Sequence, residues 1–146
     1  MHGPLGSRFV AVFPGRVTKH AYQDGGVRQP QYGVGVRSDL TFTSGKGTPP
    51  TLNVEIETLT NVVPAHRLRA FLRSYLPSTD GGRIIMWHGH TAALEIVRGC
   101  NPSGQCDGVV GTLAVIDGAK LFDVWTSQAN DATAKAALGT FYLIRG

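Results

Sequence analysis

The sequence predicts an α+β fold in which a mostly antiparallel β-sheet is flanked by helices. Strand-like apolar runs are joined by turn-length segments such as Asp24-Gly25-Gly26 and Asp117-Gly118. Such short connections favour antiparallel pairing, because parallel strands need crossovers of about a dozen residues or more. Helical spacing of apolar residues is confined to 64–76 and 129–144. The 146 residues are 42% hydrophobic and 16% charged, which predicts one globular domain.

The first third of the chain predicts strands. Residues 9–13 form an apolar run that Pro14-Gly15 ends, since this pair is a strong turn signal. Residues 17–23 and 27–37 flank the glycine turn at 24–26, which predicts a hairpin. Residues 39–43 then predict a short strand that runs into the glycine- and proline-rich loop 44–50.

An alternating strand and an amphipathic helix follow this loop. Over residues 52–58, apolar side chains alternate with Asn53, Glu55 and Glu57, so one strand face is predicted to be apolar and the other solvated. Pro64 suits the first turn of a helix, and the apolar residues behind it recur at helical spacing until Pro77.

The second half predicts two hairpins and a closing helix. Strands at 83–87 and 92–97 are separated by His88-Gly89-His90, and strands at 109–116 and 121–126 flank Asp117-Gly118. The alanine-rich run 129–144 predicts a C-terminal helix, for which Ser127 is a good N-cap.

The N-terminal residues predict a tag remnant ahead of the domain. Gly3-Pro4-Leu5-Gly6-Ser7 matches the scar of a protease-cleavable fusion tag, so we assign residues 1–7 to it and residues 8–146 to a single domain. Because a strand-like run starts at once at Arg8, we expect that a signal peptide or membrane anchor precedes this domain in the natural protein.

The charge pattern argues against nucleic-acid binding. The net charge is +4, but the basic residues are scattered, with Arg67, Arg69 and Arg73 as the densest group. Proteins that follow a phosphate backbone concentrate Lys and Arg on one face and interleave aromatic residues. We therefore expect no nucleic-acid partner and interpret the arginine group as the solvated side of a helix.

The cysteine pair predicts a local disulfide. Cys100 and Cys106 bracket a short polar loop, and closing a loop of about seven residues contributes on the order of 2 kcal/mol. Two free thiols are the alternative; redox or metal chemistry is disfavoured because the spacing is not that of thioredoxin-like pairs. A disulfide would indicate an oxidising compartment outside the cytoplasm.

The sequence predicts neither catalysis nor a bound metal or cofactor. Glu55, Glu57 and Glu95 are candidate paired carboxylates, but the face that holds the first two is expected to be solvated. His88 and His90 offer two imidazoles without further ligands nearby, so a plain inter-strand loop is favoured over a metal site. The nucleophile elbow of the α/β-hydrolases is absent.

Large amphipathic rings give the candidate binding surface. Trp87, Trp125 and Tyr142 complete a core or line a pocket or interface, and core packing is the first expectation. If a ligand or partner surface exists, we expect it at Trp87, His88, His90 and Trp125.

The chain resembles the PsbP-like group of α/β/α sandwich domains found in exported proteins of mycobacteria. The resemblance is carried by Phe9-Val10-Ala11-Val12-Phe13-Pro14-Gly15, by Gly89-His90-Thr91-Ala92-Ala93-Leu94-Glu95, by Ala114-Val115-Ile116-Asp117-Gly118 with Leu121-Phe122-Asp123-Val124-Trp125, and by a closing helix that ends in Phe141.

This resemblance implies a function. Members of the group are non-catalytic accessory or binding domains, and mycobacterial examples assist trehalose monomycolate export. It therefore implies a periplasmic domain, anchored to the inner membrane, whose partner is the mycolate exporter of the resistance-nodulation-division type. A lipid or small-molecule carrier, with mycolate lipid as its ligand and a pocket beside Trp87 and Trp125, is the alternative. An uncharacterised hydrolase ranks last.

Overall fold

A computed structural model describes residues 9–23, 28–45, 50–78, 82–99 and 108–144. The predicted tag remnant and both cysteines lie outside these residues. The elements are β1 (Phe9–Val10), β2 (Val17–Gln23), β3 (Arg28–Gln29), β4 (Val34–Ser44), β5 (Thr51–Leu59), α1 (Leu68–Arg73), β6 (Arg83–Trp87), β7 (His90–Gly99), β8 (Gly108–Asp117), β9 (Lys120–Gln128), α2 (Asp131–Gly139) and β10 (Tyr142–Leu143), with 3₁₀ turns at Pro30–Tyr32 and Ala65–Arg67.

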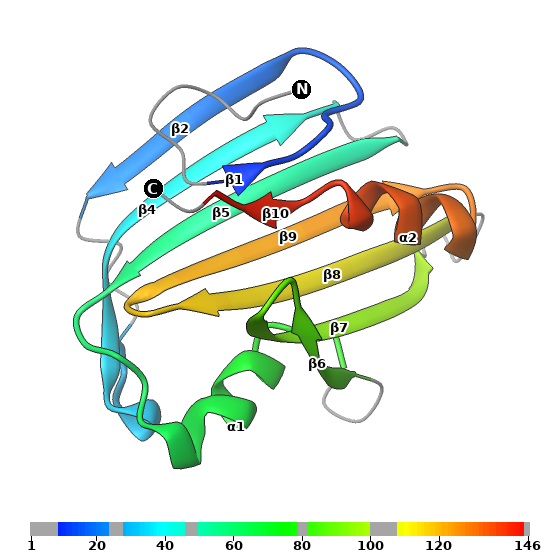
Figure 1. The fold of residues 1–146 in the computed structure, drawn as a ribbon. Coiled ribbons are helices and arrows are strands. Elements are labelled where there is room, and N and C mark those ends of the chain that lie inside the picture. Colours follow the sequence, from blue (N-terminus) through cyan, green and yellow to red (C-terminus); the bar gives the residue numbers. More distant parts are fainter. Residues whose placement is uncertain (1–8, 24–27, 46–49, 79–81, 100–107, 145–146) are drawn as a thin grey trace.

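One curved antiparallel sheet dominates the fold (Figure 1). Its strand order is β2-β4-β5-β9-β8-β7-β6, with β3 paired to one end of β4, and each pairing among the described strands is antiparallel. The predicted antiparallel α+β fold is therefore confirmed. None of the helices in the described part of the chain is both long and apolar enough to cross a membrane.

Each sheet face is covered by a different helix. On one face, here called the α2 face, a core forms around Phe42, Phe122 and Phe141. Figure 1 shows α2, β1 and β10 lying across this side of the sheet. On the opposite face, the α1 face, Phe71 and Leu72 of α1 pack in a second core with strand residues such as Ala93, Ala114 and Leu121. Because side chains alternate along a strand, neighbouring residues belong to different cores.

The predicted hairpin between residues 17–23 and 27–37 is partly wrong. The partner of β2 is β4, with Val17 opposite Ser44 and Gln23 opposite Ser38, and β4 continues from Val34 through the predicted boundary at residue 38. A register shift between Val36 and Ser38 marks a bulge, which lets one bent strand take the place of two.

The predicted C-terminal helix is also shorter than expected. Ser127 belongs to β9, α2 begins after the N-cap Asn130 and ends at Gly139, and Tyr142–Leu143 form β10 against β1. Pairing with a strand near the other end of the chain overrides the local helical pattern, because buried apolar contacts outweigh intrinsic propensity.

The cap of α2 gives a first prediction. Asn130 Oδ1 accepts a hydrogen bond from the Thr133 backbone N–H at 2.9 Å, and the Thr133 hydroxyl accepts one from the Asn130 N–H in return. Asn130→Ala should lower the free energy of unfolding by about 1 kcal/mol, because a helix-end N–H loses its partner. Urea denaturation measures this, with the exposed Ala132→Ser as control; equal midpoints would contradict it.

Candidate functional site

Trp87 anchors the end of β6 to the C-terminal segment. Its indole Nε1 donates a hydrogen bond to the backbone carbonyl of Phe141 at 2.8 Å, and its ring packs against the α2-face core. Trp87 therefore fulfils the first expectation for a large ring, which is to complete a core with its polar atom satisfied.

Trp125 lies on the other side of the sheet. Along β9, Phe122 and Val124 belong to the α2-face core while Leu121 belongs to the α1-face core, so alternation places Trp125 on the α1 face. The two tryptophans that we grouped as one candidate surface are therefore on opposite faces of the sheet.

His88 and Gly89 form the tight turn between β6 and β7. Both have left-handed backbones, with φ of 48° and 87°, and Trp87 pairs with His90 across the turn. A two-residue hairpin of this type requires positive φ at both central positions, which histidine tolerates better than most residues. Turn formation thus accounts for the His-Gly-His sequence. The ring of His88 lies 6.0 Å from that of Tyr142.

Exposed apolar side chains follow the small β1–β10 sheet beside this turn. Val12, Tyr142 and Ile144 are about two-fifths exposed, at 39%, 43% and 41%. Val10 pairs with Tyr142, and the Val12 N–H donates to Thr140 Oγ1 at 3.0 Å, so the three residues follow one another along the same pair of segments. We call Val12, Tyr142 and Ile144 the outer strip. The ring contact between Tyr142 and His88 places the outer strip beside the β6–β7 turn.

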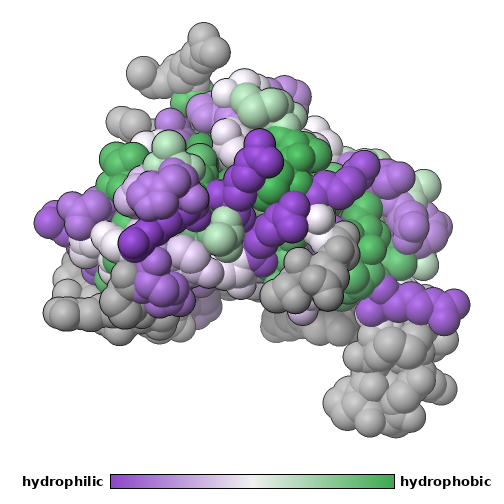
Figure 2. All heavy atoms as spheres, turned by 90° about the horizontal axis from the view of Figure 1, so that it is seen from below, coloured by the Kyte–Doolittle hydropathy of each residue, from purple (hydrophilic) through white to green (hydrophobic). Residues whose placement is uncertain are grey.

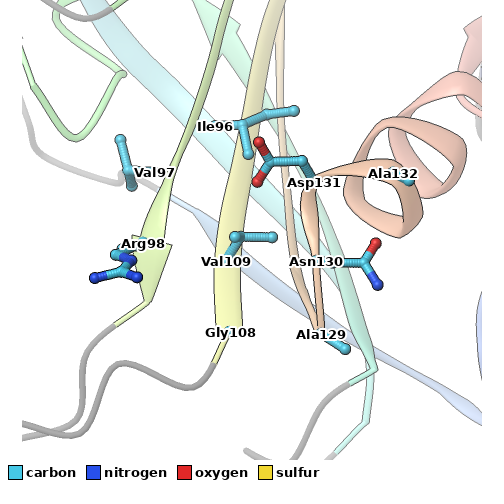
Figure 3. A pocket seen from close by; sticks show the side chains of 9 residues that line it. All are labelled: Ile96, Val97, Arg98, Gly108, Val109, Ala129, Asn130, Asp131 and Ala132. Atoms are coloured by element: carbon cyan, nitrogen blue, oxygen red, sulfur yellow. The ribbon is translucent and has the colours of Figure 1, made fainter.

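A pocket of about 670 Å³ opens at the other end of the sheet (Figure 3). Its apolar lining includes Ile96, Val109 and Ala129, and its polar lining includes Arg98 and Asp131. The end of β7, the start of β8 and the start of α2 build it, and Gly99 pairs with Gly108 at its border. The segment that holds Cys100 and Cys106 joins these two glycines and lies outside the described residues. The disulfide therefore stays a prediction.

Four carboxylates form a cluster on the α1 face. Asp39 on β4, Glu55 and Glu57 on β5, and Asp123 on β9 occupy adjacent strands, with Asp39 opposite Glu57 and Glu55 opposite Asp123. We call these residues the acidic cluster. One carboxylate oxygen from each of Asp39, Glu55 and Glu57 lies within 4.8 Å of the others.

The cluster is not solvated, so the expectation for this strand face is wrong. Glu57 is 8% exposed, and its Oε2 accepts a hydrogen bond from the Tyr75 hydroxyl at 2.7 Å, while Glu55 and Asp39 are half-buried. The segment after α1 covers this part of the sheet because Phe71 and Leu72 hold it in the α1-face core. Asp123 Oδ1 is buried and has no hydrogen-bond partner among the described residues.

Burial and mutual repulsion disturb the acidity of these groups. Burial raises the pKa of Glu55 to about 9, and the hydrogen bonds and charges of Asp39 and Glu57 raise it further in the same direction. Burial, then the charges of Glu57 and Asp39, raises the pKa of Asp123 to about 7. Burial also raises the pKa of Glu57, against the hydrogen bonds from Tyr75 and Glu55. The charged groups acting on all three are acidic.

Glu95 belongs to a different arrangement. It is 3% exposed on β7, and its carboxylate accepts hydrogen bonds from the backbone N–H of Ser78, at 2.8 Å, and from the Ser78 hydroxyl. Two strands, β9 and β8, separate β7 from β5. Glu95 therefore fixes the chain after α1 and does not join the acidic cluster.

Sequence reasoning missed Asp39, Asp123 and Tyr75. One signal was present, because Asp123 interrupts the apolar run Leu121-Phe122-Asp123-Val124-Trp125 and aspartate is depleted in strands. That β4, β5 and β9 bring their carboxylates together could not be predicted without the strand order, since Asp39 and Asp123 are far apart in the chain.

Comparison with known proteins identifies no relative. A scan against protein-family models, a search of curated proteins and a search of solved structures each find no match to this chain. The PsbP-like resemblance therefore stays a prediction that depends on the residues quoted for it.

Proposed function

We propose that this chain is a non-catalytic accessory domain of the cell envelope that assists export of trehalose monomycolate by binding the inner-membrane mycolate transporter of the resistance-nodulation-division type. The proposal extends the PsbP-like resemblance, and within that group it places the chain with the trehalose monomycolate transport factor. In this proposal the domain lies on the periplasmic side of the inner membrane, held by an anchor upstream of Arg8.

The outer strip is the observation that carries this proposal. Exposed apolar residues that follow one another along a segment favour a protein or membrane contact over a purely solvated role. Val12, Tyr142 and Ile144 meet this description, and they are backed by a rigid base, because Phe9 and Phe141 beneath them are fully buried. Met86 and Val62 are also exposed, at 67% and 65%. On the face in Figure 2, hydrophilic and apolar residues are interspersed.

Co-purification tests the partner. The full-length anchored protein, extracted in mild detergent, should retain the exporter, and Ile144→Asp should lower the recovered exporter by about tenfold or more, because a charge would be buried at the contact. Val62→Asp is a matched control, since Val62 is 65% exposed and lies between β5 and α1, away from the outer strip. Absence of the exporter from the wild-type preparation, or equal loss in both variants, would refute this function.

The pocket beside α2 favours a second candidate, a carrier of lipids or other small molecules. Its volume of about 670 Å³ falls in the range of known ligand pockets, and its mixed lining, with Ile96 and Val109 beside Arg98 and Asp131, suits an amphipathic ligand such as a glycolipid. It replaces the site that we expected beside Trp87 and Trp125.

Native mass spectrometry distinguishes the two candidates. After incubation with mycolate lipids, a one-to-one adduct that Val109→Arg abolishes would support the carrier, because the new side chain would fill the pocket. Val62→Arg is the matched control at an exposed site outside the pocket. A protein that stays free of lipid while it retains the exporter supports the accessory domain.

A further inference from the structure

We propose that the groove between α2 and the outer strands β7 and β6 binds an amphiphile that has an apolar chain and an anionic head group. This inference rests on the carrier, the second candidate above, and names the chemical class of its ligand. The accessory-domain function does not depend on it, because the outer strip and the exporter play no part in this groove.

The groove consists of two neighbouring pockets on the α2 face. The pocket beside α2, of about 670 Å³, adjoins a smaller one of about 180 Å³, since Ile96 and Asp131 line both. The smaller pocket extends along β7 to Leu94 and reaches Arg83 on the edge strand β6. We call the two pockets together the α2 groove. It follows β7 from Arg98 at one end to Arg83 at the other.

The floor of the α2 groove is apolar. Leu94, Ile96 and Val109 alternate in step with the residues of the α2-face core, so their side chains point to this face. The helix packs mainly on β8 and β9, where Gly111 lets it lie close, since a Cβ there would come within 3.0 Å of Leu138. On β7 and at the start of β8 the three floor residues are therefore only half-buried, which suits contact with an apolar chain.

An arginine stands at each end of the α2 groove. Arg98 at the end of β7 lines the larger pocket, and Arg83 at the start of β6 lines the smaller one. Both side chains are exposed, and neither forms an ion pair with another described residue. A guanidinium presents its N–H donors in a planar fork that matches a carboxylate or a phosphate. Both ends can therefore bind an acidic head group.

The acidic residues beside the groove do not cancel these charges. Asp131 lies four residues before Lys135 on α2, and both line the smaller pocket, so their charges offset each other. Figure 3 shows the Asp131 carboxylate pointing toward Ile96. Glu95 alternates to the other face, where Ser78 holds its carboxylate. The two arginines leave the α2 groove with a net positive charge, which an anionic head group complements.

Isothermal titration calorimetry with laurate, dodecyl phosphate and dodecyl maltoside tests this ligand class. The three compounds carry similar alkyl chains on a carboxylate, a phosphate and a neutral sugar. We expect each anion to bind at least about tenfold more tightly than the maltoside, because a charge-assisted hydrogen bond contributes more than a neutral one. Either anion supports the proposal, and the tighter of the two identifies a fatty acid or a phospholipid as the source.

A charge-matched pair of double variants tests the arginines. Arg83→Gln with Arg98→Gln should weaken laurate binding about tenfold or more, to the level of the maltoside. Arg69→Gln with Arg73→Gln is the control, since both residues are exposed on α1 and their loss removes the same net charge. This control should bind laurate as the wild type does. Urea denaturation verifies that both double variants are folded.

Methyl NMR locates the ligand. Laurate should shift the methyl resonances of Leu94, Ile96 and Val109, and binding that leaves all three unmoved would overturn the groove. Equal affinity for laurate and the maltoside would overturn the anionic head group while the carrier stands, and so would an equal loss in both double variants. If none of the three compounds binds, this inference fails, and the mycolate adduct described above decides the carrier separately.

Discussion

Phe141→Ala is expected to lower the free energy of unfolding by about 4 kcal/mol, because it opens a cavity where the two sheets meet. Phe141 is fully buried between α2 and β10, and its ring centroid lies 5.7 Å from that of Phe9 and 6.0 Å from that of Phe122. Its backbone carbonyl also accepts the Trp87 indole hydrogen bond. The aromatic ring therefore links the first strand, the central sheet and the C-terminal segment.

Urea denaturation followed by tryptophan fluorescence measures this loss. Ile144→Ala is the control, since Ile144 is 41% exposed three residues further along and should change stability by less than about 0.5 kcal/mol. A cost below about 1 kcal/mol for Phe141→Ala would show that the β1–β10 sheet contributes little to the core, contrary to the packing described above.

Asp123→Asn is expected to stabilise the protein by about 1–2 kcal/mol at pH 8, because it removes a buried charge without a partner among the described residues. The raised pKa of Asp123, about 7 against an ordinary 3.8, means that the folded state holds a proton that the unfolded state has released. The stability of the wild type should therefore be highest below about pH 4 for this group and fall as the pH rises to about 7.

Glu55 extends the same effect to higher pH. Its pKa of about 9 lies above the ordinary 4.5, so the fall in stability from this group spans about pH 4.5 to 9. The charges of Asp39 on β4 and Glu57 on β5 act on both groups. Because Glu55 is half-exposed, we expect a combined loss on the order of only 2 kcal/mol between pH 5 and pH 8.

Denaturation midpoints at pH 5 and pH 8 measure this dependence. Asp123→Asn should flatten it, whereas the matched variant Asp117→Asn should follow the wild type. A wild-type protein that is more stable at pH 8 than at pH 5 would contradict the electrostatics of the acidic cluster and would indicate that these carboxylates have favourable partners in the folded state.

Local patterns predicted the fold well where neighbours in sequence are neighbours in space. The Asp117-Gly118 signal gave the β8–β9 hairpin, with Gly118 at a φ of 59° and Asp117 opposite Lys120. The alternation at 52–58 gave β5 and its apolar side. The α1 helix was placed correctly but spans only Leu68–Arg73, because the chain turns at Ser74, whose hydroxyl donates to the Phe71 carbonyl.

The sequence by itself determined most of the strands, their antiparallel pairing and the two tight hairpins, since turn chemistry and side-chain alternation act over a few residues. Only the tertiary structure decided which strands lie side by side. It separated Trp87 from Trp125, turned Tyr142–Leu143 into a strand, and brought Asp39 and Asp123 to opposite sides of β5. These outcomes depend on contacts between distant segments, whose burial outweighs the local preferences that a sequence displays.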